Sequence, residues 1–154
     1  MENIDTMAAA KDIDNTAEHA FFPVTVYSGF YRNYYQFPAY KNKDGEILIA
    51  HFGLKKFAHE IMRQRSAENK VPVCYVYHAV DPSASHCVVD CTFSMGAYAV
   101  TETGESSLRT LRSDIARNYP YLEAQKRAFD RAVISFWQLE LDGRRLHSDA
   151  EISS

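Results

Sequence analysis

The sequence is poor in the residues from which catalytic and cofactor-binding motifs are usually built. Its 154 residues include 6 glycines, 3 cysteines and 1 tryptophan. The glycines are scattered singly, which excludes a Gly-rich phosphate-binding loop. The G-x-S-x-G and H-E-x-x-H motifs are also missing, so neither a serine hydrolase nor a zinc protease is indicated. We therefore expect a protein that is not an enzyme and that binds no cofactor.

The few cysteines also argue against disulfides and a metal site. Their odd number and wide spacing are typical of a protein in a reducing compartment. Cys74 and His78, like Cys87 and Cys91, have ligand-like spacing, but both pairs lie on predicted strands. Residues i and i+4 of a strand are about 13 Å apart, whereas zinc holds each sulfur at about 2.3 Å. We expect no metal site.

Long hydrophobic runs and an excess of positive charge are missing as well. No stretch approaches the roughly 18–20 apolar residues of a membrane span, and residues 1–15 lack the apolar core of a signal peptide. We therefore expect a cytoplasmic protein without a membrane partner. The formal net charge of −3 removes the simplest electrostatic argument for nucleic-acid binding.

The acidic charge is concentrated at the N-terminus. Residues 1–20 hold five acidic residues and one lysine, a net charge of −4, and the remaining chain has 16 basic and 15 acidic residues, a net charge of +1. We interpret residues 1–20 as a flexible acidic arm. Residues 21–142 are predicted to form a single domain. Residues 143–154 are predicted to be a polar tail, in which Ser148 is a candidate cap for a last helical turn.

Hydrophobic periodicity predicts an α+β domain. Strands are expected at 24–40, 47–50, 71–80, 87–95 and 97–104, and helices at 54–70 and from Pro120 to the Asp142-Gly143 turn. The segment 87–95 alternates strictly between apolar and polar residues, as a half-buried strand does. The order of hairpin, helix, three-stranded meander and helix predicts an antiparallel sheet with two main helices packed on one face.

The last predicted helix has an apolar stripe and a basic edge. The stripe has helical spacing and is assigned to the core: Phe129, Ala132, Val133, Phe136 and Trp137. Lys126 precedes Asp130 by four residues and can pair with it. Arg127 and Arg131 lie four residues apart without an acid between them.

Two interpretations of this basic edge remain open. The first is ordinary solvated helix surface. The second is a surface that follows a polyanion, because the planar guanidinium fork suits phosphate. In that case Arg127 and Arg131 contact phosphates, helped by Lys126 and by Arg112 and Arg117 in the preceding segment.

Aromatic residues offer a second nucleic-acid feature. The stretch 24–40 contains Tyr31, Tyr34 and Tyr35, which could stack on unpaired bases if they are exposed. The alternative is that these rings belong to the core and to the faces of a sheet.

Two short patterns resemble known proteins. Thr103-Gly104-Glu105, followed by a helix with Ala124, Arg127, Ala128, Arg131 and Ala132, is similar to the end of the core of phage and plasmid single-strand annealing proteins. Over residues 71–140 the chain also resembles an uncharacterised family of conjugative elements and phages of Gram-positive bacteria. The resemblance implies a non-enzymatic protein of a mobile element that binds single-stranded nucleic acid as a homo-oligomer.

A different interpretation fits the small size and the acidic balance. Small acidic proteins of mobile elements often inhibit host defence nucleases, anti-CRISPR proteins among them. Such a protein would bind a host nucleoprotein complex, and residues 1–20 could then mimic nucleic acid. The sequence predicts single-stranded nucleic-acid binding first and nuclease inhibition as the alternative.

Overall fold

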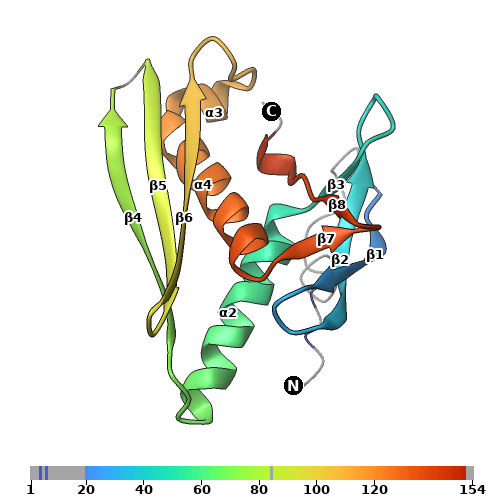
Figure 1. Ribbon diagram of the computed structural model, residues 1–154. Coiled ribbons are helices and arrows are strands. Elements are labelled where there is room, and N and C mark those ends of the chain that lie inside the picture. Colours follow the sequence, from blue (N-terminus) through green and yellow to red (C-terminus); the bar gives the residue numbers. More distant parts are fainter. Residues whose placement is uncertain (1–3, 5, 7–19, 84, 152–154) are drawn as a thin grey trace.

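The computed structural model describes residues 4, 6, 20–83 and 85–151. The fold has three layers. Two antiparallel sheets enclose two main helices (Figure 1). The predicted α+β class is confirmed, but the hairpin and the meander belong to different sheets, and the helices lie between the sheets. The elements are β1 (Phe22–Ser28), β2 (Asn33–Lys41), β3 (Ile47–Ile49), α2 (His51–Ala67), β4 (Val73–Pro82), β5 (His86–Met95), β6 (Tyr98–Ser107), α3 (Asp114–Asn118), α4 (Pro120–Phe136), β7 (Leu139–Leu141), β8 (Arg144–Arg145) and the 3-10 helix η1 (Asp149–Glu151).

The first sheet has the strand order β3-β2-β1-β7-β8. The single strand predicted for residues 24–40 is wrong, because the chain reverses there and β1 pairs with β2. The turn includes Arg32, whose φ of 53° is left-handed. Aromatic residues continue on both sides of this turn, so composition alone did not reveal it. The predicted hairpin at Asp44-Gly45 is confirmed by the pairing of β2 with β3.

The last long helix ends earlier than predicted. It stops at Phe136, and the chain turns at Gln138, whose φ is 51°, into β7. β7 then pairs with β1. The Ser28 hydroxyl donates to Trp137 O at 2.7 Å and ties the helix end to the sheet. Asp142-Gly143 is therefore the turn between β7 and β8 rather than the end of a helix.

The second sheet is the predicted meander, in the order β4-β5-β6. Along β5, Cys87, Val89, Cys91 and Phe93 are buried and the residues between them are half-buried. This confirms the predicted alternation. Helix α4 packs on the inner face of this sheet, and the outer face is open to solvent (Figure 1).

The core between the sheets is largely aromatic. The apolar stripe of α4 is buried as predicted, and the Trp137 ring lies 5.5 Å from Phe57 of α2 and 5.4 Å from Phe93 of β5, between ring centroids. Burial of such large rings contributes on the order of 1.5–3 kcal/mol each. None of the helices in the described part of the chain combines the length and the apolar character needed to cross a bilayer.

Residues 143–151 are part of the domain rather than a separate tail. Leu146, Ser148 and Ala150 are buried, and Ile49 N donates to His147 O at 2.9 Å. A short 3-10 turn follows Ser148, but its hydroxyl has no hydrogen-bond partner among the described residues.

Two residues of the predicted N-terminal arm are also packed. Ile4 and Thr6 are buried, and the Thr6 hydroxyl donates to Gln36 O. The rest of the predicted acidic arm, 1–3, 5 and 7–19, lies outside the described residues.

Candidate functional site

Arg127 is a buried structural residue. Only 7% of it is exposed. Its Nε donates to Ala150 O at 2.7 Å, and its Nη1 donates to Glu105 O at 2.6 Å. Burial lowers the pKa of this guanidinium, and nearby Glu123 acts in the opposite direction. Both interpretations of the basic edge place Arg127 on an exposed surface, and its burial shows that this placement is wrong.

Arg131 is also engaged within the molecule. Its Nε and Nη2 donate to the two carboxylate oxygens of Glu151 at 2.7 and 2.6 Å, and its Nη1 donates to Thr103 O at 2.6 Å. The hydrogen bond to Glu151 raises the pKa of the guanidinium. The helix itself supplies no acid for Arg131, but Glu151, 20 residues later, does. Neither predicted phosphate-binding arginine is free.

Gly104 explains why these arginines reach β6. A Cβ at this position would lie 2.2 Å from Ala124 O and 2.3 Å from Ala128 N, which is far too close. Glycine and the small alanines thus let α4 lie directly on the strand, and the two arginines donate to the carbonyls on either side of Gly104. These donors also cover the free edge of β6, which would otherwise be open to strand pairing.

The other predicted cations lie elsewhere. Lys126 does not pair with Asp130; its Nζ lies 3.3 Å from Glu123 Oε1, and nearly half of the side chain is exposed. Arg112 and Arg117 are exposed and make no ion pair or hydrogen bond through their side chains within the described part of the chain. They lie on the segment that leads into α4, so these two arginines remain available to a ligand, whereas a ligand would share Lys126 with Glu123.

The three predicted stacking tyrosines have different environments. Tyr35 is buried, and burial raises the pKa of its hydroxyl. Tyr31 is half-buried and packs against Phe30. Tyr34 is 67% exposed, but the cavity beside it is lined by Glu140 and Asp142. The structure therefore does not bring these rings together with the basic residues.

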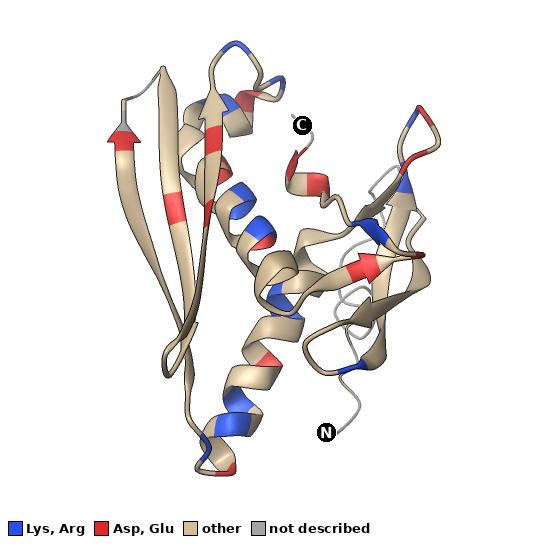
Figure 2. Cartoon of the chain, in the orientation of Figure 1, with Lys and Arg blue, Asp and Glu red and all other residues tan. Residues whose placement is uncertain are grey.

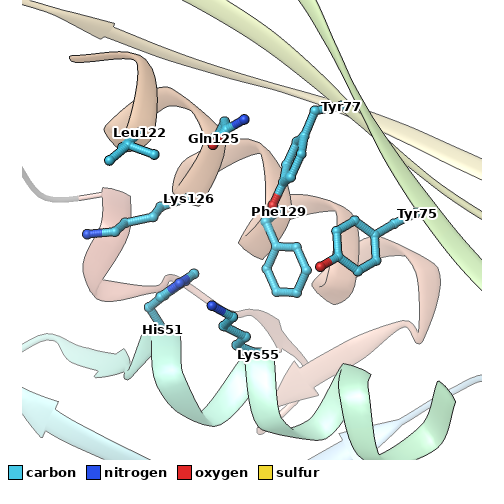
Figure 3. Close-up of a pocket in the computed structure, with 8 residues that line it drawn as sticks. All are labelled: His51, Lys55, Tyr75, Tyr77, Leu122, Gln125, Lys126 and Phe129. Carbon is cyan, nitrogen blue, oxygen red and sulfur yellow. The ribbon is translucent and has the colours of Figure 1, made fainter. Parts of the chain in front are cut away.

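A different cavity combines cations with aromatic rings. It has a volume of about 300 Å³ and lies between α2, α4 and β4. Figure 3 shows its lining side chains, which come from all three elements. These residues are His51, Lys55, Tyr75, Tyr77, Leu122, Gln125, Lys126 and Phe129. We refer to this cavity as the α2–α4 pocket.

The α2–α4 pocket has a positively charged rim. Figure 2 shows basic residues on both α2 and α4. Lys55 is exposed and makes no ion pair or hydrogen bond through its ammonium with the described residues. Lys126 contributes a second ammonium from the neighbouring helix. The rings of Tyr75 and Tyr77 are half-buried on the wall formed by β4, and Tyr75 stacks on His59 and Phe93 at centroid distances of 5.9 and 5.0 Å. The pocket thus combines ammonium groups with aromatic side chains.

A histidine and a buried carboxylate meet beside this pocket. His51 Nδ1 lies 2.7 Å from Asp130 Oδ1. Asp130 is completely buried, and its Oδ2 has no partner among the described residues. When the Asp130 carboxylate is ionised it only accepts hydrogen bonds, so a neutral imidazole carries its proton on Nδ1 and keeps a lone pair on Nε2. The Phe129 ring packs edge-on against the imidazole at a centroid distance of 6.0 Å.

The backbone of His51 is fixed as well. His51 N, at the start of α2, donates to Asp149 Oδ1 at 2.8 Å. Burial raises the pKa of Asp149 to about 6, and the backbone hydrogen bond opposes that change. The C-terminal segment thus positions the first turn of α2 and the imidazole that begins it.

Sequence reasoning missed the principal residues of the α2–α4 pocket. His51 and Asp130 are 79 residues apart, and no local pattern connects them. The only available signal was that Lys55 lies off the apolar stripe of its helix. Comparison of the chain with family models, curated proteins and solved structures found no match, so the pocket is interpreted from its own geometry.

Proposed function

We propose that this protein binds single-stranded nucleic acid and that the α2–α4 pocket holds one of its nucleotides. The observation that carries the proposal is the convergence of Lys55 and Lys126 with Tyr75 and Tyr77 around one cavity of about 300 Å³. Ammonium groups neutralise phosphate, and every base offers a face that can stack on an aromatic ring.

Exposed arginines extend this surface beyond the pocket. Arg112 and Arg117 precede α4, whose first turns carry Leu122 and Lys126 into the pocket wall. A strand that enters the pocket could therefore continue along the N-terminal end of α4. The proposal keeps Lys126, Arg112 and Arg117 from the sequence prediction and replaces Arg127 and Arg131 with Lys55.

The test is fluorescence anisotropy of a labelled single-stranded oligodeoxythymidylate at increasing KCl concentration. We expect each of Lys55→Gln and Lys126→Gln to reduce the slope of log affinity against log salt by about 1, because one phosphate contact is lost. Lys43→Gln is the matched control, since Lys43 is exposed at the β2–β3 turn, outside the pocket. Equal effects of all three substitutions, or no binding at low salt, would reject the proposal.

The resemblance to single-strand annealing proteins leads to a more specific form of the binding proposal. We propose that the protein acts in a mobile element, as an oligomer that anneals complementary strands. Light scattering during size-exclusion chromatography measures the oligomeric state, and strand pairing of two complementary oligonucleotides measures annealing. A monomer that does not accelerate pairing would reject this version without affecting the binding proposal.

A second candidate function is inhibition of a host nuclease by protein binding. The supporting observation is the cavity lined by Tyr27, Tyr34, Glu140 and Asp142, whose carboxylates and rings suit a basic side chain of a partner. Addition of the protein to a purified guide-loaded CRISPR nuclease tests this idea. Target cleavage should fall with the natural protein and recover with Glu140→Lys; no inhibition of the nuclease would argue against it.

A further inference from the structure

We propose that the α2–α4 pocket cleaves RNA strands, with His51 as the general base. This inference rests on the proposed binding of single-stranded nucleic acid and adds a reaction to it. Its basis is the pairing of His51 with Asp130 at 2.7 Å on the wall of a pocket that also holds two lysines.

The imidazole is arranged as a base. Asp130 holds the proton on Nδ1, so Nε2 is the nitrogen that can accept a proton. The Asp130 carboxylate is completely buried and its other oxygen has no partner in the described part of the chain. A carboxylate in this position stabilises the imidazolium that forms when His51 accepts a proton. Asp130 is therefore a positioning residue, and Asp149 fixes the backbone of the same histidine.

The lining of the pocket indicates where the nucleophile comes from. Its eight residues include no serine, threonine or cysteine. Burial raises the pKa of the Tyr75 and Tyr77 hydroxyls, which keeps both phenols protonated and weakly nucleophilic. A hydroxyl to be activated by His51 then belongs to the substrate or to water. In RNA the ribose 2′-hydroxyl already lies next to the phosphorus, and such an intramolecular nucleophile has a large advantage in proximity over water. DNA lacks this hydroxyl, so the same pocket would bind DNA without cleaving it.

The reaction is a balanced transesterification. His51 Nε2 takes the proton of the 2′-hydroxyl while O2′ forms a bond to the adjacent phosphorus. The bond between phosphorus and O5′ breaks, and the departing O5′ takes a proton from the Lys126 ammonium, on the helix across the pocket. Lys55 neutralises the non-bridging oxygens. The products are a 2′,3′-cyclic phosphate and a 5′-hydroxyl, and exchange with solvent returns the proton from His51 to Lys126.

The experiment uses a labelled DNA oligonucleotide that contains one ribonucleotide. We expect the full chain to cut it at that position in the presence of EDTA and to leave a cyclic phosphate end. An all-DNA strand and a strand with a 2′-O-methyl group should be bound and left intact. His51→Gln should lower the cleavage rate at least about 100-fold, the usual contribution of a general base, with unchanged DNA affinity.

Matched variants separate this role from a loss of structure. His78 is exposed on the opposite face of β4 from Tyr77, and His78→Gln should cleave at the natural rate. Imidazole added to His51→Ala should restore part of the activity. Asp130→Asn should lower the maximal rate while the Michaelis constant stays near its natural value, an outcome that general unfolding would not give.

A modified substrate distinguishes the base from the acid. When sulfur replaces the bridging O5′, the leaving group needs no proton. With the substrate saturated by protein, which removes the effect of weaker binding, the sulfur should restore most of the cutting rate of Lys126→Gln, whereas His51→Gln should remain slow. Equal slowing of both variants on this substrate would contradict the assigned roles.

Three results would overturn the inference. Binding of the chimeric strand without cleavage would reject the reaction and leave the proposed binding function intact. Equal cleavage by the natural protein and by His51→Gln would assign the activity to a contaminating nuclease. No binding of any strand would reject both the reaction and the proposed function.

Discussion

Helix α4 carries basic residues on two edges, and these edges have opposite environments. On one edge the guanidinium groups of Arg127 and Arg131 donate hydrogen bonds to β6 and to the C-terminal segment. On the other edge Lys126 projects into the rim of the α2–α4 pocket. The availability of a cation thus depends on what packs against it, because neighbouring positions of one helix face different surroundings.

The short helix η1 contacts the arginine edge of α4 and the start of α2. Ala150 and Glu151 accept hydrogen bonds from the arginines, while Asp149 accepts one from the backbone of His51 beside the pocket. The C-terminal segment therefore connects the arginine edge of α4 to the first turn of α2, beside the pocket. Substitutions on either edge should separate effects on stability from effects on binding.

The largest effect is expected from Gly104→Ala. The new Cβ would meet backbone atoms of α4 at 2.2 and 2.3 Å, so the helix would have to move away from β6. We expect the free energy of unfolding to fall by about 4 kcal/mol, at the high end for overpacking. Urea denaturation measures it. Gly45→Ala is the control: nothing lies near that position, and its φ of +79° should cost about 1 kcal/mol.

Arg127→Met should destabilise the protein by about 3 kcal/mol, because two carbonyls lose their donor in a buried site. Lys126→Met, the adjacent residue, should change stability by less than about 0.5 kcal/mol and weaken DNA binding instead. Chemical denaturation and anisotropy on the same samples test the contrast. If Arg127→Met stays fully stable but loses DNA affinity, our assignment of the two edges is reversed.

Asp149→Asn should change how stability depends on pH. The folded-state pKa of about 6 lies above the ordinary 3.8, so between these values the folded protein binds the proton more strongly than the unfolded chain. Stability therefore decreases as pH rises through this window, and the loss of stability, roughly 3 kcal/mol, is complete above about pH 6. Asparagine still accepts from His51 N but carries no charge. We expect the variant to be more stable than the natural protein at pH 7.5 and similar at pH 4, by urea denaturation.

The smallest effect is expected from Glu151→Gln, which removes the charge that Arg131 contacts while leaving Thr103 O as an acceptor. A partly exposed bidentate pair contributes about 1 kcal/mol. Thermal unfolding at low and high salt measures the loss. A salt-independent stability in the natural protein and the variant alike would show that the pair contributes little.

The α+β class, the meander and the apolar stripes could be predicted from the amino-acid sequence alone. These features follow from periodicity, which records on which side of a strand or helix the apolar residues lie. The spacing from Phe129 to Trp137 therefore suffices to assign that stripe to the core.

The turn within 24–40 was missed, since its aromatic residues are equally compatible with one strand or two. The end of α4 at Phe136 was missed because the pairing partner of the following strand, β1, lies more than a hundred residues earlier.

The environment of each charged side chain, in contrast, is set by tertiary packing. Arg127, Arg131 and Lys126 look equivalent in the sequence, but Glu105, Ala150 and Glu151 reach only the first two. The pairing of His51 with Asp130 likewise joins the start of one helix to the middle of another. Such contacts depend on how α2, α4 and the C-terminal segment pack together, and a charged residue carries no periodic signal that identifies its distant partner. The hydrophobic pattern is a local property of the chain, whereas the partners of a buried charge are a property of the complete fold.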